Sequence, residues 1–289
     1  MTSAAKLAVV VLTYNEELNL RACLASLQGL DLTLVVVDSG STDRTLTIAA
    51  DYGARILIHE FASHARQWRW ALDQLDPGVE WVLGLDADQR FSVELRDELA
   101  VLFAAGHQRL LEIDGFYVNR RQIFRGQWIH HGGYYPKYLL KLFRLSKVQI
   151  DERDLMDHHF YVSGKVAELR HDLIEDNRNE ANIGFWLSKH IGYADLHARE
   201  ELARRCATQP WLIQPAFFGS PDQRVVWCKR LWYRMPLYAR PFLYFMYRYI
   251  LLGGVLDGKQ GFIFHFLQSF WYRLLVDIRL DDMLTQMDS

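Results

Sequence analysis

The stretch Trp81-Val-Leu-Gly-Leu-Asp86-Ala-Asp88 joins a short apolar run to two carboxylates that are separated by one alanine. The run is too short for a typical helix, so we predict a buried strand that ends at the first carboxylate. Ser92 can cap the amphipathic helix that is expected over about residues 93–105. In an open α/β sheet, ligands bind beyond the carboxyl ends of the strands, which is where Asp86 and Asp88 are expected.

Two neighbouring carboxylates repel each other unless a cation or a positively charged ligand lies between them. Oxygen ligands favour a hard cation such as Mg²⁺ or Mn²⁺, which can share its coordination with the phosphates of a substrate. Alternatively, one aspartate caps the following helix and the other is a solvated turn residue, because Asp-x-Asp is common in turns. The pair fits both interpretations, and the rest of the chain has to distinguish them.

The composition narrows the class of protein. A chain of 289 residues can form one large α/β domain with an appendage, or two domains. The net charge of −2 argues against nucleic acid as a partner. The cysteines Cys23, Cys206 and Cys228 form no CxxC pair, which indicates free thiols in a reducing compartment. The first residues lack the apolar core of a secretory signal, so we expect a cytoplasmic protein.

Apolar runs alternate with segments of helical periodicity in the first third of the chain. We predict strands over residues 7–12, 32–37, 55–58 and 81–85. Helices are predicted over residues 20–27 and 65–75, and a further helix, which Thr42 or Asp43 can cap, is predicted to end at residue 50. This alternation implies parallel βαβ units with right-handed crossovers, as in a Rossmann-like nucleotide-binding domain. Neither GxGxxG nor GxxxxGK[ST] follows the first strand, which argues against a dinucleotide dehydrogenase and a P-loop phosphotransferase.

Polar residues stand at the carboxyl ends of successive strands, and loops at that edge of a sheet converge on one crevice. They are Thr13, Asn15, Glu16, Asp38, Asp86 and Asp88. Residues 116–120 and 138–144 are predicted to add strands of mixed direction, separated by a loop rich in glycine, aromatics and histidine. Residues 151–178 then carry many acids and histidines, which are candidate site residues. The alternative interpretation is a charged stretch that solvent surrounds.

Residues 223–289 form a separate zone, which we distinguish from a predicted catalytic domain over residues 1–222. Segments 241–256 and 261–278 are apolar and rich in aromatics, but charged residues interrupt them. They are also shorter than the roughly 20 apolar residues that a bilayer-spanning helix needs. We expect helices that lie in a membrane surface, with Trp and Tyr at headgroup level. A helical hairpin that packs on the domain or on another subunit is the alternative.

Three motifs in this order resemble family 2 glycosyltransferases of the GT-A fold. They are Val9-Val-Val-Leu-Thr-Tyr-Asn-Glu-Glu-Leu-Asn-Leu20, Val37-Asp-Ser-Gly-Ser-Thr-Asp43 and Leu85-Asp-Ala-Asp88. Within that family, Asp114-Gly-Phe-Tyr-Val-Asn-Arg-Arg121 and Leu140-Lys-Leu-Phe-Arg144 are similar to lipopolysaccharide-core β-1,4-glucosyltransferases and related exopolysaccharide transferases. The resemblance reaches about Asp176, and it implies a mixed sheet with a nucleotide-sugar site.

The resemblance further implies a UDP-sugar donor, a divalent metal (Mg²⁺ or Mn²⁺) and inversion at the anomeric carbon. By motif position, Thr13, Asn15, Glu16 and Asp38 would hold the nucleotide, Asp86 would face the ribose or donor sugar, and Asp88 would ligate the metal. The family often uses a distant histidine as another ligand, and His171 is the candidate. Arg69 or Arg66 would contact phosphate, although Gln67-Trp-Arg-Trp-Ala-Leu72 lacks the asparagine that relatives carry before Trp-Ala-Leu.

Inversion requires the acceptor hydroxyl to attack opposite the departing UDP, so a carboxylate must remove its proton. The base must lie across the sugar from the metal, which excludes Asp86 and Asp88. Relatives place an acid shortly before the segment that is Gly164-Lys-Val here, and Asp157 is therefore the predicted base. Glu175 and Asp176 are the alternatives.

The chain lacks the Gln-x-x-Arg-Trp motif of processive synthases, so we expect transfer of a single hexose, such as glucose, to a lipid-linked glycan acceptor. This acceptor would belong to lipopolysaccharide or exopolysaccharide synthesis. Residues 223–280 would hold the enzyme on the inner face of the cytoplasmic membrane, and its aromatic helices are compatible with a homo-oligomer. The basic residues expected to meet anionic headgroups are Lys229, Arg230, Arg234, Arg240 and Arg248.

Two other functions compete with this reading. One is a catalytically inactive GT-A scaffold that recruits enzymes to the membrane, against which the intact aspartates argue. The other is a sugar nucleotidyltransferase, which would need a glycine-rich loop with a basic residue after the first strand. Thr13-Tyr-Asn-Glu16 is not such a loop.

Overall fold

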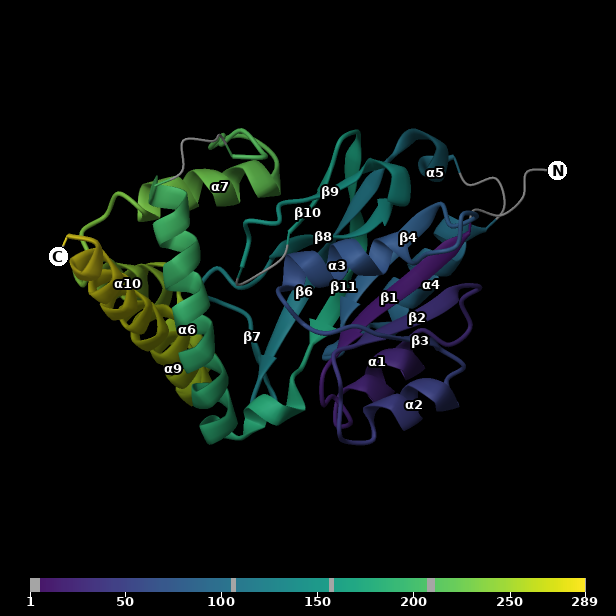
Figure 1. Cartoon of the computed structure of the whole chain (residues 1–289), viewed down its shortest axis with the longest axis horizontal. Helices are drawn as coiled ribbons and strands as arrows, with labels where there is room; N and C mark the ends of the chain where they lie inside the picture. Colours follow the sequence, from purple (N-terminus) through teal and green to yellow (C-terminus); the bar gives the residue numbers. More distant parts are fainter. Residues whose placement is uncertain (1–5, 105–107, 156–158, 207–210, 289) are drawn as a thin grey trace. The chain divides into compact units, whose positions relative to one another are not determined.

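The computed structural model describes residues 6–104, 108–155, 159–206 and 211–288, and the chain divides into two compact units (Figure 1). The first unit comprises the described parts of Met1–Trp128, Tyr135–Ile150 and His158–Ala181, and the second comprises those of Ile129–Tyr134, Asp151–Asp157 and Asn182–Ser289. The boundary predicted at residue 222 thus falls inside the second unit, because a long helix over Ile183–Cys206 packs with the C-terminal helices.

A nine-stranded sheet forms the centre of the first unit, in the order β3-β2-β1-β4-β8-β6-β11-β5, with β7 beside β6. The strands are β1 (Leu7–Thr13), β2 (Thr33–Asp38), β3 (Arg55–Ile58), β4 (Trp81–Asp86), β5 (Gln89–Phe91), β6 (Gly115–Phe124), β7 (Gln127–Ile129), β8 (Tyr138–Arg144) and β11 (Val166–Glu175). Strands β1 to β4 are parallel, whereas β8 runs antiparallel to both β4 and β6. The predicted mixed sheet is therefore confirmed. Strands β9 (Val148–Ile150) and β10 (Phe160–Val162) form a small separate sheet.

Helices cover both faces of this sheet. They are α1 (Leu20–Ser26), α2 (Thr45–Asp51) and α4 (Val93–Phe103) on one face, and α3 (His64–Asp73) on the other, with a short α5 (Arg109–Glu112) before β6. Val9 and Val11 pack against the first group, whereas Val10 packs with Trp68 of α3. Both faces of β1 are thus buried, which explains why its sequence is an unbroken apolar run. Ser92 caps α4 as predicted, since its hydroxyl accepts a hydrogen bond from the Leu95 amide.

The second unit is helical. Its elements are α6 (Ile183–Cys206), α7 (Pro221–Trp232), α8 (Ala239–Met246), the π-helical turn η3 (Tyr247–Leu251), the 3₁₀ turn η4 (Gly254–Asp257), α9 (Gly258–His265), the π-helical turn η5 (Phe266–Trp271) and α10 (Tyr272–Asp288). Ala194 and Ala198 of α6 pack against Val276 and Leu280 of α10. Within the described ranges, no helix combines the length and apolar character needed to cross a membrane.

Several charged side chains are buried inside this unit, and many apolar side chains are exposed on its surface. The Arg240 guanidinium is fully buried, where it pairs with Glu201 of α6 at 2.7 Å and with Asp277 of α10 at 2.5 Å. Arg248 donates a hydrogen bond to the Gly132 carbonyl at 2.6 Å, and its guanidinium lies over the rings of Tyr134 and Tyr244. Both arginines were expected to meet lipid headgroups. For the buried Arg240 that expectation is wrong, and Arg248 is engaged inside the unit.

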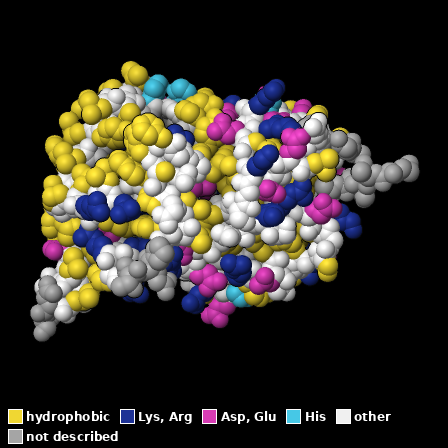
Figure 2. Space-filling model, turned by 90° about the horizontal axis from the view of Figure 1, so that it is seen from above, with side chains coloured by type: hydrophobic (Ala, Val, Ile, Leu, Met, Phe, Trp, Pro, Cys, Tyr) yellow, Lys and Arg dark blue, Asp and Glu magenta, His cyan; other side chains and the backbone are white. Residues whose placement is uncertain are grey.

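The outer surface of α8, α9 and the turns beside them is correspondingly apolar. Its exposed side chains are Phe242, Leu243, Tyr247, Ile250, Leu251, Val255, Leu256, Phe262 and Phe266. Figure 2 shows one face of the molecule, on which hydrophobic side chains crowd over the helical unit.

Candidate active site

The carboxyl ends of three parallel strands carry predicted site residues at one edge of the sheet. Thr13 at the end of β1 is in register with Asp38 at the end of β2. Asp86 at the end of β4 is in register with Leu12, one residue before Thr13. The ends of these three strands therefore lie at the same edge of the sheet, as predicted, because parallel strands in register bring their ends together.

The carboxylate of Asp38 is fully buried and shapes the loop that follows β2. Its Oδ1 accepts hydrogen bonds from the hydroxyls of Thr13 at 2.9 Å and Ser41 at 2.5 Å. Its Oδ2 accepts from the amides of Gly40 at 2.9 Å and Ser41 at 2.7 Å. Because these four bonds engage both oxygens, Asp38 organises the loop, and its direct contact with a nucleotide stays a prediction.

The loop after β1 is tied to the loop after β2. Asn15 adopts a left-handed conformation (φ 54°), which asparagine tolerates better than most residues. Its amide donates to the Ser41 hydroxyl at 2.8 Å, and its side-chain oxygen accepts from the Thr42 amide at 2.8 Å. The Glu16 amide donates to the Thr45 hydroxyl at 2.8 Å. The two loops thus form one structured rim beside the strand ends.

A chain of amides joins Glu16 to Asp88. Asn19 donates through Nδ2 to Glu16 Oε2 at 2.7 Å and to Asn177 Oδ1 at 3.2 Å. Asn177 in turn donates to Asp88 Oδ2 at 3.0 Å, and the Asp176 amide donates to the Asp88 carbonyl at 2.9 Å. Sequence reasoning missed Asn19 and Asn177, because a pairing across 158 positions leaves no local pattern.

Asp86 has a cationic partner that sequence reasoning also missed. Lys141 of β8 is 4% exposed, and its Nζ lies 3.1 Å from Asp86 Oδ2. The backbone amide of Asp86 donates to Gln89 Oε1 at 3.1 Å, which holds the start of the turn after β4. A lysine within the apolar run of β8 was the available signal, since a buried ammonium needs a partner.

The buried Cys23 thiol lies in the combined field of these acids. Burial raises the pKa of Cys23, and the negative charges of Asp88, Asp86 and Glu16 raise it further. The hydrogen bonds that run from Glu16 through Asn19 and Asn177 to Asp88, with Asp86 two residues before Asp88, place the three carboxylates in the same part of the unit. Such an excess of negative charge favours a bound cation.

The residues present fit a divalent cation that is shared with a substrate. Across the described ranges, no three His, Cys, Asp or Glu side chains form a ready-made metal-binding group. Mg²⁺, however, is commonly held by one or two carboxylates together with substrate phosphates. Asp88, which accepts a hydrogen bond from Asn177, would supply one such carboxylate, and Asp86 is the neighbouring candidate.

His171 does not join Asp88. Its Nδ1 lies 2.9 Å from Glu98 Oε2 of α4. Asp176, whose amide donates to the Asp88 carbonyl, lies five positions after His171, just beyond the end of β11. At about 3.3 Å per residue, that separation is about 16 Å. The predicted pairing of His171 with Asp88 in one metal site is therefore corrected by the structure.

The predicted phosphate contact, Arg69, is exposed on α3, and this role stays a prediction. Gln67 on the same helix is buried and reaches toward the strand ends. Its Nε2 donates to the Ser39 hydroxyl at 3.2 Å, and its Oε1 lies 2.7 Å from His59 Nδ1. Gln67 thereby ties α3 to the ends of β2 and β3.

The two alternative bases are both engaged in ion pairs on the Asp88 side. Glu175 pairs with Arg120 at 2.9 Å, and Asp176 pairs with Arg90 at 2.9 Å. Because the Asp176 amide also contacts Asp88, these acids lie on the side of the predicted metal, whereas the base is required opposite it. Asp157, the first choice, lies outside the described residues.

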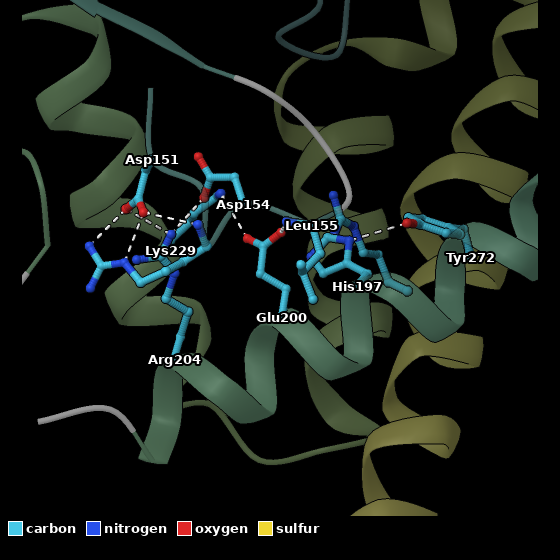
Figure 3. Close-up of polar contacts among 10 residues, drawn as sticks. Asp151, Asp154, Leu155, His197, Glu200, Arg204, Lys229 and Tyr272 are labelled. Carbon is cyan, nitrogen blue, oxygen red and sulfur yellow. Dashed lines mark hydrogen bonds and ion pairs between the residues drawn. The ribbon is translucent and has the colours of Figure 1, made fainter. Parts of the chain in front are cut away.

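The segment that leads to Asp157 is anchored on α6, as Figure 3 shows. Arg204 pairs with Asp151 at 3.0 Å and with Asp154 at 2.7 Å. The Leu155 amide donates to Glu200 Oε2 at 3.0 Å. Burial raises the pKa of Asp151, but hydrogen bonds from Arg153 and the charge of Arg204 outweigh it and lower that pKa to about 2. Residues 151–155 are thus held firmly within the helical unit.

Comparison with known proteins identifies the family. The model described as Glycosyl transferase family 2 matches residues 8–176. The lipopolysaccharide core biosynthesis glycosyltransferase LpsC of Rhizobium meliloti is 30% identical over 174 residues, which cover 57% of this chain and 60% of LpsC. An uncharacterized glycosyltransferase of Rickettsia bellii is 31% identical over 103 residues, or 36% of this chain. The match spans only about a third (34%) of that relative's length.

Solved structures show a weaker likeness. S. aureus TarS (residues 1–349) in complex with UDP aligns with a TM-score of 0.44 and 15% identity, over 97% of this chain and 91% of that one. Glucosyl-3-phosphoglycerate synthase of Mycobacterium tuberculosis with Mn²⁺ and UDP-glucose aligns with a TM-score of 0.32 and 21% identity, over 42% and 44% of the two chains. Likeness at this level carries no functional argument. The family match covers residues 8–176, which include all but the first residue of the sheet, and the chain belongs to glycosyl transferase family 2.

Proposed function

We propose that this protein is an inverting, metal-dependent, non-processive glycosyltransferase that moves one hexose from a UDP-sugar to a lipid-linked glycan. The observation that carries the proposal is the position of Glu16, Asp86 and Asp88 beside the structured loops of a family 2 unit, where Asn19 and Asn177 link Glu16 to Asp88 by hydrogen bonds. The name of the relative LpsC supports lipopolysaccharide core as the class of acceptor, with exopolysaccharide as the related choice.

The donor would bind along the rim formed by the loops after β1 and β2. In this proposal Thr13, Asn15, Glu16 and the Asp38 loop frame the nucleotide, Arg69 contacts phosphate, and Asp86 faces the ribose or donor sugar. Asp88, oriented by Asn177, would hold Mg²⁺ or Mn²⁺. When bound, the cation stabilises the negative charge that develops on the departing diphosphate.

Asp157 would remove the proton of the acceptor hydroxyl as the new bond forms. General-base catalysis of this kind contributes about 10²–10⁴-fold. The role is assigned to Asp157 because relatives carry an acid shortly before the segment that is Gly164-Lys-Val here.

The helical unit would place the enzyme on the inner face of the cytoplasmic membrane, where a lipid-linked acceptor presents its sugar. Its apolar outer surface and its inward-facing Arg240 and Asp277 support a lipid environment, since exposed apolar patches of this kind mark interaction sites. Arg230 and Arg234 are exposed and would meet anionic headgroups. A second copy of the chain is the competing occupant of this surface.

UDP release from a panel of nucleotide sugars, with Mn²⁺, Mg²⁺ or EDTA, tests the reaction. Metal-dependent turnover of one donor, abolished by Asp88→Ala, is the expected result. Metal-dependent UDP binding without turnover would direct the search to lipid acceptors in membrane extracts. If the wild-type chain neither binds nor turns over any donor, the inactive-scaffold alternative is favoured.

Vesicle cosedimentation tests the membrane surface. Deleting residues 223–289 would strip α10 from α6, so point variants are preferable. Leu251 and Leu256 are 76% and 71% exposed, and Leu251→Glu with Leu256→Glu should lower binding to anionic vesicles at least about tenfold. Leu111→Glu is the matched control, because Leu111 is 77% exposed in the first unit. Unchanged vesicle binding with a lost dimer would favour the second copy.

A further inference from the structure

A β-bulge in β8 places one lysine differently from its neighbours. Phe116 of β6 pairs with Leu142, whereas Tyr117 pairs with Leu140, so Lys141 is the extra residue of β8. Leu140 consequently packs on the α3 face of the sheet and Leu142 on the opposite face. In a regular strand, residues two positions apart share a face. Bulges of this kind redirect side chains and are frequent beside active sites.

The redirected side chain ends among the carboxylates of the candidate site. Lys141 Nζ contacts Asp86 Oδ2 at 3.1 Å, and the Lys141 side chain is 5% exposed whereas that of Asp86 is 34% exposed. The ammonium therefore lies on the protein side of Asp86, away from solvent. Lys141 pairs with Asp86, whereas Arg120 pairs with Glu175 and Arg90 pairs with Asp176.

The carboxylates and the ammonium in this arrangement have opposite effects on the affinity for a cation and on the affinity for an anion. Glu16, Asp86 and Asp88 supply three carboxylates, and Lys141 supplies one ammonium, which lies 3.1 Å from Asp86. The ammonium repels a divalent cation and attracts an anionic diphosphate, and it also orients the Asp86 carboxylate. Since these effects have opposite signs for the two ligands, they can be separated from a loss of fold.

We propose that Lys141 is a positioning residue of the donor site, which orients Asp86 and balances the affinity for the metal against that for the diphosphate. The inference rests on the proposed function, because it assigns the carboxylates to a metal and a nucleotide-sugar. It adds a residue of β8 to a proposed site that otherwise comprises strand ends, the loops that follow them and Arg69 of α3.

Lys141→Met in the full chain removes the charge and retains an unbranched side chain between two leucines. We expect its dissociation constant for Mn²⁺ alone to fall about tenfold, and that for UDP in EDTA to rise about tenfold. That size is typical of one charge several ångströms from an ion, at an effective dielectric constant near 20 with screening by salt. Lys141→Arg preserves the charge and should stay within about threefold of the wild type for both ligands.

Calorimetry of UDP binding and paramagnetic titration of Mn²⁺ give both constants without turnover. If Lys141→Met weakens both ligands together, or changes neither, the inference is overturned while the proposed function stands. If the wild-type chain binds neither Mn²⁺ nor UDP, the proposed function is wrong, and the inference that rests on it is wrong as well. Opposite shifts in Lys141→Met, rescued by Lys141→Arg, support the positioning role.

Discussion

Replacing Arg240 by methionine should destabilise the helical unit severely. The buried guanidinium donates to Glu201 Oε1 at 2.7 Å, to Glu201 Oε2 at 3.0 Å and to Asp277 Oδ1 at 2.8 Å and 2.5 Å. All three side chains are fully buried. Arg240→Met would therefore leave two carboxylates inside the unit without their shared cation.

Removing one partner of a buried ion pair costs about 3–5 kcal/mol of unfolding free energy. Glu201 keeps Arg205 at 2.6 Å, and Asp277 keeps a hydrogen bond from the Tyr238 amide at 2.8 Å. These remaining partners favour the lower half of that range, about 3–4 kcal/mol. With a urea m-value of about 2 kcal/mol/M, the unfolding midpoint should fall by about 1.5–2 M.

Urea unfolding followed by circular dichroism at 222 nm measures this loss, because the unit is helical. Arg234→Met is the matched control, since Arg234 is exposed, and it should change stability by less than about 0.5 kcal/mol. Replacing Arg240, Glu201 and Asp277 together by apolar residues should restore much of the stability. A loss below about 1 kcal/mol in Arg240→Met would refute the reasoning from a buried ion pair.

Three further predictions concern other parts of the chain. Gly132→Ala should lower the free energy of unfolding by about 2–4 kcal/mol, because φ is +67° and the added carbon would overlap the His265 ring. Gly126→Ala (φ +80°, open surroundings) should cost only about 1 kcal/mol of backbone strain, and urea unfolding measures both losses. Burial, aided by the charge of Arg248, lowers the pKa of His265 from 6.5 to about 4. The stability that depends on neutral His265 is therefore fully present above about pH 6.5, and it falls by up to about 1.4 kcal/mol per pH unit between pH 6.5 and pH 4. His265→Phe should flatten that slope in unfolding curves measured across this pH range. Asp157→Asn should lower kcat about 10²–10⁴-fold with donor binding intact, and an unchanged kcat would exclude it as the base.

Much of the first unit follows from local sequence patterns. Runs such as Val9 to Leu12 form strands that are buried on both faces, so they contain no polar alternation. Polar residues at the ends of these runs, such as Thr13 and Asp38, meet because parallel strands share an edge. Ser92 signals the start of α4 through its own hydroxyl. Periodicity and capping act within a few residues, which is why the sequence alone was sufficient here.

The partners of the site residues depend on contacts between distant segments. Lys141 reaches Asp86 through a bulge that shifts the register of β8, and no pattern in the sequence marks that bulge. Asn19 and Asn177 meet because β11 ends beside the turn after β4. His171 faces Glu98 instead of Asp88 because of its position along β11, and Arg240 is drawn inside by acids on α6 and α10. A charged or amide residue looks the same in the sequence whether it binds a ligand, a lipid or another side chain. Only the packing of the folded chain determines its partner.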